Sequence, residues 1–163
     1  MSDILGRFLN WLKENKWFVE VNQDGKIILE KCIDERYNMD NEHKEFLSYF
    51  RRIISPDEKT CFLCCDEYND RSDLAFKWNE FELLSLEVAQ DDDEWAEEIR
   101  QWWNAKLPII ISVKDGYSFY AIDMKDCKRK IVRGEEPEFE ETEIIANSFN
   151  EFLELIISGT LIL

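Results

Sequence analysis

The cysteines are the residues whose chemistry stands out first: Cys32, Cys61, Cys64, Cys65 and Cys127. Cys61 and Cys64 form a C-x-x-C pair, a spacing used by zinc sites and by thiol–disulfide exchange. A zinc site needs further ligands, but the sequence has no second C-x-x-C and His43 is the only histidine. A redox pair would begin a helix, whereas residues 60–65, TCFLCC, are apolar and short enough for a buried strand. Because the cysteine count is odd, we expect free, buried thiols with a structural role.

Carboxylates are the second group that could do chemistry, because 36 acidic residues face only 20 basic ones. They are so numerous that spacing alone selects no catalytic pair. Asp123 ends an apolar run, but no second carboxylate, histidine or glycine-rich loop lies near it, so we interpret it as a strand-end residue. The acids between Asp91 and Glu98 would fan around a helix, and they lack the ligand spacing of a calcium loop.

The phosphate-binding and nucleophile-elbow motifs of common enzymes are absent from the sequence. We therefore predict that the protein is not an enzyme and needs no metal or cofactor. The alternative is an enzyme that uses a carboxylate or Cys64 as its reactive group. A thiol with a low pKa, which reacts quickly at neutral pH, would indicate the cysteine version of that alternative.

The composition sets limits on the class of protein and its partners. With 45% hydrophobic and 13% aromatic residues, the chain is expected to form a packed core. No apolar run reaches the roughly 20 residues that span a bilayer, and the first residues do not resemble a secretion signal, so we expect a cytoplasmic protein. The net charge of −16 argues against binding to nucleic acid or anionic membranes. It suits a basic protein partner, or serves solubility alone.

A β-hairpin is predicted by LPIIISVKDGYSFYAIDM, residues 107–124, where two apolar runs flank an Asp-Gly pair. Asp115 and Gly116 suit a two-residue type I′ turn, in which both central residues have positive φ. That turn would set Ile111 opposite Tyr120. One face of the hairpin would then lie in the core, and the other would be a mixed surface that a helix or loop partly covers.

Helices are predicted where apolar residues repeat every three or four positions, over residues 3–12, 41–54, 91–103 and 149–157. Asp40 or Asn41 would cap the second of these, and His43 in its polar first turn is expected to be exposed. Residues 17–31 predict a second hairpin, residues 130–133 predict a short strand, and residues 74–88 leave helix and strand open. The pattern predicts one α+β domain over residues 1–163, with an antiparallel-rich sheet and flanking helices.

Two acidic stretches flank the central hairpin in sequence, so they are expected on one rim of the sheet beside exposed aromatic side chains. Such a border of charge around aromatic anchors is typical of protein-binding surfaces. The candidate partner-binding residues are Asp91, Asp92, Asp93, Glu94, Glu97, Glu98, Trp103, Tyr117, Glu135, Glu136, Glu138, Glu140 and Glu141.

The C-terminal half resembles the SUKH superfamily, most clearly over residues 107–157. The early helix NEHKEFLSYF, residues 41–50, is also similar to that family's first helix. The positions that carry the resemblance are Leu107, Pro108, Gly116, Tyr120, Asp123, Ile145, Ala146, Ser148, Phe149, Phe152 and Leu153.

The resemblance implies an α+β domain without an enzymatic site. Many bacterial members of that superfamily are immunity proteins that bind and neutralise polymorphic toxins, often nucleases, and fungal relatives regulate cell-wall synthesis through protein contacts. We therefore expect a cytoplasmic immunity protein, a monomer or weak dimer, whose acids bind the basic cleft of a toxin domain. The alternative is a regulatory or scaffolding protein of the same fold with an endogenous partner.

Overall fold

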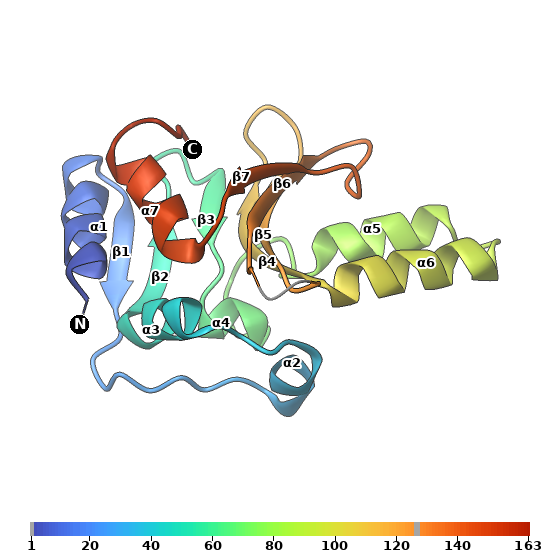
Figure 1. Cartoon of the computed structure of the whole chain (residues 1–163), viewed down its shortest axis with the longest axis horizontal. Helices are drawn as coiled ribbons and strands as arrows, with labels where there is room; N and C mark the ends of the chain where they lie inside the picture. Colours follow the sequence, from blue (N-terminus) through green and yellow to red (C-terminus); the bar gives the residue numbers. More distant parts are fainter. Residues whose placement is uncertain (1, 126–127) are drawn as a thin grey trace.

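The computed structural model describes residues 2–125 and 128–163, which form an antiparallel sheet of seven strands with helices packed around it (Figure 1). The strands lie side by side in chain order: β1 (Phe18–Val21), β2 (Phe50–Ile54), β3 (Thr60–Phe62), β4 (Lys106–Ser112), β5 (Ser118–Asp123), β6 (Ile131–Glu135) and β7 (Glu143–Ala146). The helices are α1 (Asp3–Glu14), α2 (Lys31–Arg36), α3 (Asn41–Tyr49), α4 (Cys65–Tyr68), α5 (Glu80–Val88), α6 (Asp93–Asn104) and α7 (Phe149–Ile157). The predicted single α+β domain with an antiparallel sheet is confirmed.

The turn of the β4–β5 hairpin is longer than predicted. Asp115 and Gly116 take the expected positive φ values, 58° and 93°. The two-residue turn was nevertheless wrong, because strand pairing stops before residues 113–117. The N–H of Val113, the residue after β4, donates instead to the carbonyl of Lys59, the residue before β3, at 2.8 Å.

The register of the hairpin is shifted as a consequence. The last pair is Ser112 with Ser118, and Tyr120 therefore lies opposite Ile110. The predicted pairing of Tyr120 with Ile111 was wrong by one residue. A one-residue shift moves side chains to the other face of the sheet, so Ile110 and not Ile111 shares the face of Tyr120.

Both faces of the β4–β5 hairpin are buried, although one was expected to be a mixed surface. All of β4 is buried, and so is β5 up to Ile122. On one face Tyr120 packs against Phe152 of α7, with ring centroids 5.3 Å apart. On the other face Phe119 packs against Trp103 of α6, at 5.0 Å. The hairpin is therefore the middle layer between two sets of helices.

The second predicted hairpin, over residues 17–31, is not formed. Its first half is β1, but residues 27–29 form no strand, and β1 pairs with β2 instead. The side chain of Asn69 holds this segment in place. Its amide donates to the carbonyl of Ile28 at 2.6 Å, and its oxygen accepts from the N–H of Glu30 at 2.8 Å.

The helix predicted over residues 41–54 ends early. Asp40 caps α3 as expected, but the helix stops at Tyr49 and the next five residues form β2. Ile53 lies between Val19 of β1 and Phe62 of β3. A helix would leave the facing edges of β1 and β3 unpaired, so the sheet overrides the helical spacing of these residues.

The other helix predictions agree with the structure. Ser148 accepts a hydrogen bond from the N–H of Glu151 at 3.1 Å, which caps α7 as predicted. Gly159 follows that helix with a φ of 76°. The open choice over residues 74–88 resolves to a helix, α5, which begins at Glu80.

His43 is buried, which corrects the expectation that it is exposed. Its side chain is fully enclosed and neither ring nitrogen has a hydrogen-bond partner among the described residues. The ring lies 5.2 Å from the ring of Phe149 and also contacts Phe46 and Tyr68. Burial lowers the pKa of His43 to about 3, because a charged imidazole would lose its hydration there.

We predict that His43 makes the fold sensitive to acid. The unfolded chain takes up a proton on this histidine below about pH 6.5, whereas the folded protein does so only near pH 3. The free energy of unfolding should therefore fall as the pH drops through that window, by about 2 kcal/mol at pH 5. Urea unfolding of the wild type and of His43→Leu at both neutral and acid pH measures the difference. Carboxylates contribute alike to both proteins, so an equal pH dependence would contradict the prediction.

An ion pair fixes α5 to the rest of the domain. Nη2 of Arg36, at the end of α2, lies 2.8 and 3.0 Å from the two carboxylate oxygens of the buried Glu82 in α5. The guanidinium also lies over the rings of Tyr37 and Trp78, 5.1 and 5.7 Å from their centroids. The hydroxyl of Tyr37 donates to the carbonyl of Trp103 at 3.0 Å, so the same segment contacts α6.

We expect removal of Arg36 to cost more than removal of the whole pair. Arg36→Met leaves the carboxylate of Glu82 buried without its cation, at a cost of about 3 kcal/mol. The double variant Arg36→Met/Glu82→Leu removes the stranded charge and should recover part of this loss. Urea unfolding measures both, and a double variant no more stable than the single one would contradict this account.

Candidate protein-binding groove

A groove of about 520 Å³ lies between the helix pair α5–α6 and the segment that links β6 to β7. In Figure 1 the two helices lie side by side and project away from the sheet. Leu84 and Val88 of α5 line the groove, together with Trp95 and Ile99 of α6. Within each pair the residues are four positions apart, so each helix presents two apolar side chains on the same face, one turn apart.

The outer end of the groove exposes large apolar side chains. Val88 is 72% exposed and Trp95 is 45% exposed. Asp92 caps the N-terminus of α6, and its carboxylate accepts a hydrogen bond from the N–H of Trp95 at 3.0 Å. The N–H of Asp92 donates in turn to the carbonyl of the buried Ala89, which makes the connection between the helices tight. Exposed apolar surface in a formed groove is typical of contact sites.

The opposite wall of the groove is anchored at two points. Phe139 is buried and stacks on Phe81 of α5, with ring centroids 4.7 Å apart. The next residue, Glu140, accepts a hydrogen bond at 3.1 Å from Nε1 of Trp103 in α6. These contacts hold residues 136–140 against the base of the helix pair, so the groove is formed before any partner binds.

Gly134 allows that wall to lie close to the sheet. A Cβ atom at this position would be 2.6 Å from the carbonyl oxygen of Phe139 and 2.6 Å from the ring of Phe119. The sheet neighbour of Gly134 is Phe119 itself. Only glycine fits between the ring and the returning chain.

The charges around the groove have a single sign. Its lining includes Glu87 from α5 and three acids from the opposite wall, Glu136, Glu138 and Glu140, and none of the lining residues is basic. Apolar side chains therefore form the floor, with carboxylates along both walls. We call this site the acidic groove.

The structure brings together only part of the predicted acidic surface. Glu136, Glu138, Glu140 and Tyr117 line the acidic groove. The side chains of the first predicted cluster are all exposed on α6 and the turn before it: Asp91, Asp92, Asp93, Glu94, Glu97 and Glu98. None of them lines the groove. Glu141 is exposed and also lies outside the lining.

Trp103 cannot be the surface anchor that we predicted, because it is 1% exposed and packs under the sheet. Trp95 holds the exposed position instead. Both lie on the predicted apolar side of α6, and the sequence does contain a signal that separates them. Trp103 comes three residues before the buried strand β4, whereas Trp95 lies two turns further from the sheet.

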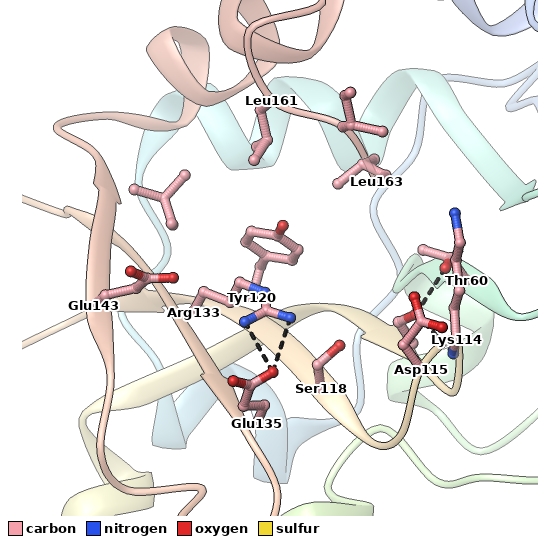
Figure 2. A pocket seen from close by; sticks show the side chains of 13 residues that line it. Thr60, Lys114, Asp115, Ser118, Tyr120, Arg133, Glu135, Glu143, Leu161 and Leu163 are labelled. Atoms are coloured by element: carbon pink, nitrogen blue, oxygen red, sulfur yellow. Dashed lines mark hydrogen bonds and ion pairs between the residues drawn. The ribbon is translucent and has the colours of Figure 1, made fainter.

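A second hollow, of about 470 Å³, lies over the sheet beneath Leu161 and Leu163 (Figure 2). Its floor includes a row of directly paired residues, Thr60, Ser112 and Ser118. The row continues to Glu135, whose carboxylate lies 3.2 Å from both Nη atoms of Arg133. The charged residues of its lining are mixed in sign: Lys114, Asp115, Arg133, Glu135 and Glu143. Glu135 therefore belongs to this hollow and not to the acidic groove.

The cysteines do not form a reactive site among the described residues. Cys61 and Cys64 are buried, as predicted, and burial raises the pKa of Cys64 well above its ordinary value. Cys32 is exposed, which differs from the expectation, and Cys127 lies outside the described residues. Over residues 2–125 and 128–163, no three His, Cys, Asp or Glu side chains converge as metal ligands would.

Asp123 has the structural environment that we predicted for it. It pairs with Lys106 across β4 and β5, and the ammonium lies 3.3 Å from its carboxylate. The same carboxylate accepts from the N–H of Lys125 at 3.0 Å, in the turn that follows.

No protein-family model and no curated protein sequence matches this chain. Within the described residues, none of the helices has the length and apolar character needed to cross a bilayer.

We predict that Gly134→Ala displaces the wall of the groove. The added methyl group overlaps Phe119 and Phe139, so the variant should lose about 1–3 kcal/mol of stability. The hydrogen bond from Trp103 to Glu140 should also weaken, which NMR detects as a shift of the Trp103 indole N–H. Gly25→Ala is the control for an added methyl group without steric overlap, because nothing lies within 4 Å of a Cβ atom there; its φ of 65° adds a backbone strain that Gly134→Ala does not have. An unchanged indole signal in Gly134→Ala would contradict the proposed role of this glycine.

Proposed function

We propose that this protein is a binding domain without enzymatic activity, a cytoplasmic immunity protein that neutralises a basic toxin domain by binding it at the acidic groove. The observation that carries the proposal is the groove itself. Its lining includes the exposed Val88 and Trp95 together with four carboxylates, and none of the lining residues is basic. Apolar anchors supply affinity in such an interface, and the charges select the partner.

The charge of the chain supports a partner that binds phosphate. A nuclease carries a basic cleft for its substrate, and carboxylates can occupy that cleft in place of phosphates. With a net charge of −16, the chain would also attract such a domain over long distances, which speeds capture at low salt. The exposed acids of α6, the helix that supplies Trp95 and Ile99 to the groove, would contribute to this attraction.

The resemblance to the SUKH superfamily supports the same proposal independently of the groove, since many bacterial members neutralise toxins. The alternative, a regulatory or scaffolding protein, would use the same groove for an endogenous partner. The two differ in their expected partners: a toxin domain should bind tightly and one to one, whereas regulatory partners should be several and weaker.

We expect reversal of charge in the groove to slow association. Glu87→Lys/Glu138→Lys changes two exposed carboxylates that make no hydrogen bond in the described structure. Glu14→Lys/Glu20→Lys is the matched control, with the same change in net charge at the α1–β1 end of the domain, away from α5 and α6 (Figure 1). The groove variant should reduce the association rate constant about tenfold at low salt and flatten its salt dependence. The control should stay within about threefold of the wild type.

The partner for this measurement comes from affinity capture with immobilised protein in extract of the source cells, at low and high salt. We expect one small basic domain, retained by the wild type and the control and lost from the groove variant. Its purified activity should be inhibited at one equivalent of this chain. An active partner that stays uninhibited would contradict neutralisation, and several weakly bound proteins would favour the regulator. Equal capture by the groove variant would show that the partner binds elsewhere.

A further inference from the structure

We infer that the part of the partner that enters the acidic groove is an amphipathic α-helix whose apolar stripe is bordered by Lys or Arg on both sides. This inference rests on the proposed function, because it specifies what binds at the same site. It follows from three properties of the groove: the spacing of its apolar floor, the state of its backbone groups and the placement of its acids.

The floor repeats with the period of a helix. Leu84 and Val88 are one turn apart on α5, and Trp95 and Ile99 are one turn apart on α6, which corresponds to about 6 Å along each helix. Tyr117 adds a further apolar contact, half-buried against Phe81 at 5.9 Å. A partner helix lying along this floor would place its residues i, i+4 and i+7 against successive apolar side chains of the floor.

The backbone around the groove offers little to an extended chain. Two of its sides are helices, whose interior N–H and C=O groups are already bonded within the helix. On the remaining wall, the N–H of Glu136 donates to the carbonyl of Tyr117, and the N–H of Glu141 donates to that of Glu138. An extended peptide would place the backbone groups on its helix-facing side against α5 and α6 without partners, whereas a helix satisfies all of its interior backbone groups internally.

The acids lie on both sides of the apolar floor. Glu87 stands on the α5 side, and Glu136, Glu138 and Glu140 stand on the opposite wall. Long basic side chains on either border of an apolar stripe can pack their stems on the floor and place their charges near these carboxylates. Glu140 is held in position by Trp103, so this acceptor is already fixed in place.

Synthetic peptides of defined pattern test the inference. The first probe is a Leu/Lys peptide of about 14 residues, roughly four turns, with Leu repeating every three or four positions. The second has the same composition with Leu and Lys alternating, which suits an extended strand. Calorimetry should show that the helical pattern binds at least about tenfold more tightly than the alternating one, and circular dichroism should show that it gains helix on binding.

Val88→Lys is the groove variant for these peptides, because Val88 is exposed and the substitution leaves the core intact. Ile162→Lys is the matched control, since it also replaces an exposed apolar side chain, 82% accessible, with the same cation outside the groove. The helical peptide should lose about tenfold in affinity with Val88→Lys and should bind Ile162→Lys within about twofold of the wild type.

Each other result overturns the inference. Equal or tighter binding of the alternating peptide would mean an extended occupant. An unchanged affinity with Val88→Lys would place the peptide outside the groove, and the absence of measurable binding would exclude a helix of this kind. The proposed function fails separately, when the natural partner is captured equally by Glu87→Lys/Glu138→Lys. If the charge-reversal variant loses the natural partner but the wild type does not bind the helical peptide, the proposed function stands and only the inference of a helical occupant is wrong.

Discussion

Burial of the β4–β5 hairpin on both faces is the constraint on which the rest of the structure depends. A sheet covered on one side could leave its second face in water, but Phe119 and Tyr120 are adjacent aromatic residues that point to opposite faces. Each needs its own cover. The face of Tyr120 receives α7, and the face of Phe119 receives the base of α5 and α6 through Phe81 and Trp103. Because only the base of the helix pair covers the sheet, the outer end of α5 and α6 remains exposed to solvent.

The acidic groove follows from that arrangement. The chain between β6 and β7 returns over Gly134 and packs Phe139 on α5, so an apolar anchor fixes a segment that is otherwise acidic. Carboxylates gathered in this way repel one another, and the proposed basic partner would relieve that repulsion while covering Val88 and Trp95. Electrostatic relief and apolar burial would then act together. A neutral partner would gain only the free energy of apolar burial, and an acidic partner would add to the repulsion between the carboxylates.

The elements that sequence predicted well are those whose signals are local. The cap of α7 at Ser148 and the positive φ of Gly116 depend on a few neighbouring residues, and both agree with the structure. The errors share a different cause, which is pairing between distant segments. Ile53 continues a helical pattern, yet it becomes part of a strand because β1 and β3 lie on either side of it. The hairpin register shifted because Val113 bonds to Lys59, a residue far away in sequence.

The sequence predicted the type of candidate site, an acidic border beside aromatic side chains, but not which residues form it. An acidic border beside aromatic side chains followed from the composition of two stretches, and Tyr117, Glu136 and Glu138 do lie together. Which tryptophan faces outward depends on where α6 meets the sheet, and helical spacing alone does not determine that. His43 shows the same limit, because one of the rings that bury it is Phe149, more than a hundred residues further along the chain.

The proposed resemblance to the SUKH superfamily and the acidic groove rest on different parts of the molecule. Tyr120, Phe149 and Phe152, three of the positions on which the proposed resemblance rests, are buried and pack in the core. The floor of the groove comes from α5 and α6, which lie between β3 and β4 and outside residues 107–157. Only its second wall and Tyr117 come from residues 107–157. If the protein binds a partner at the acidic groove as proposed, the choice of partner should depend on the helix pair more than on the sheet.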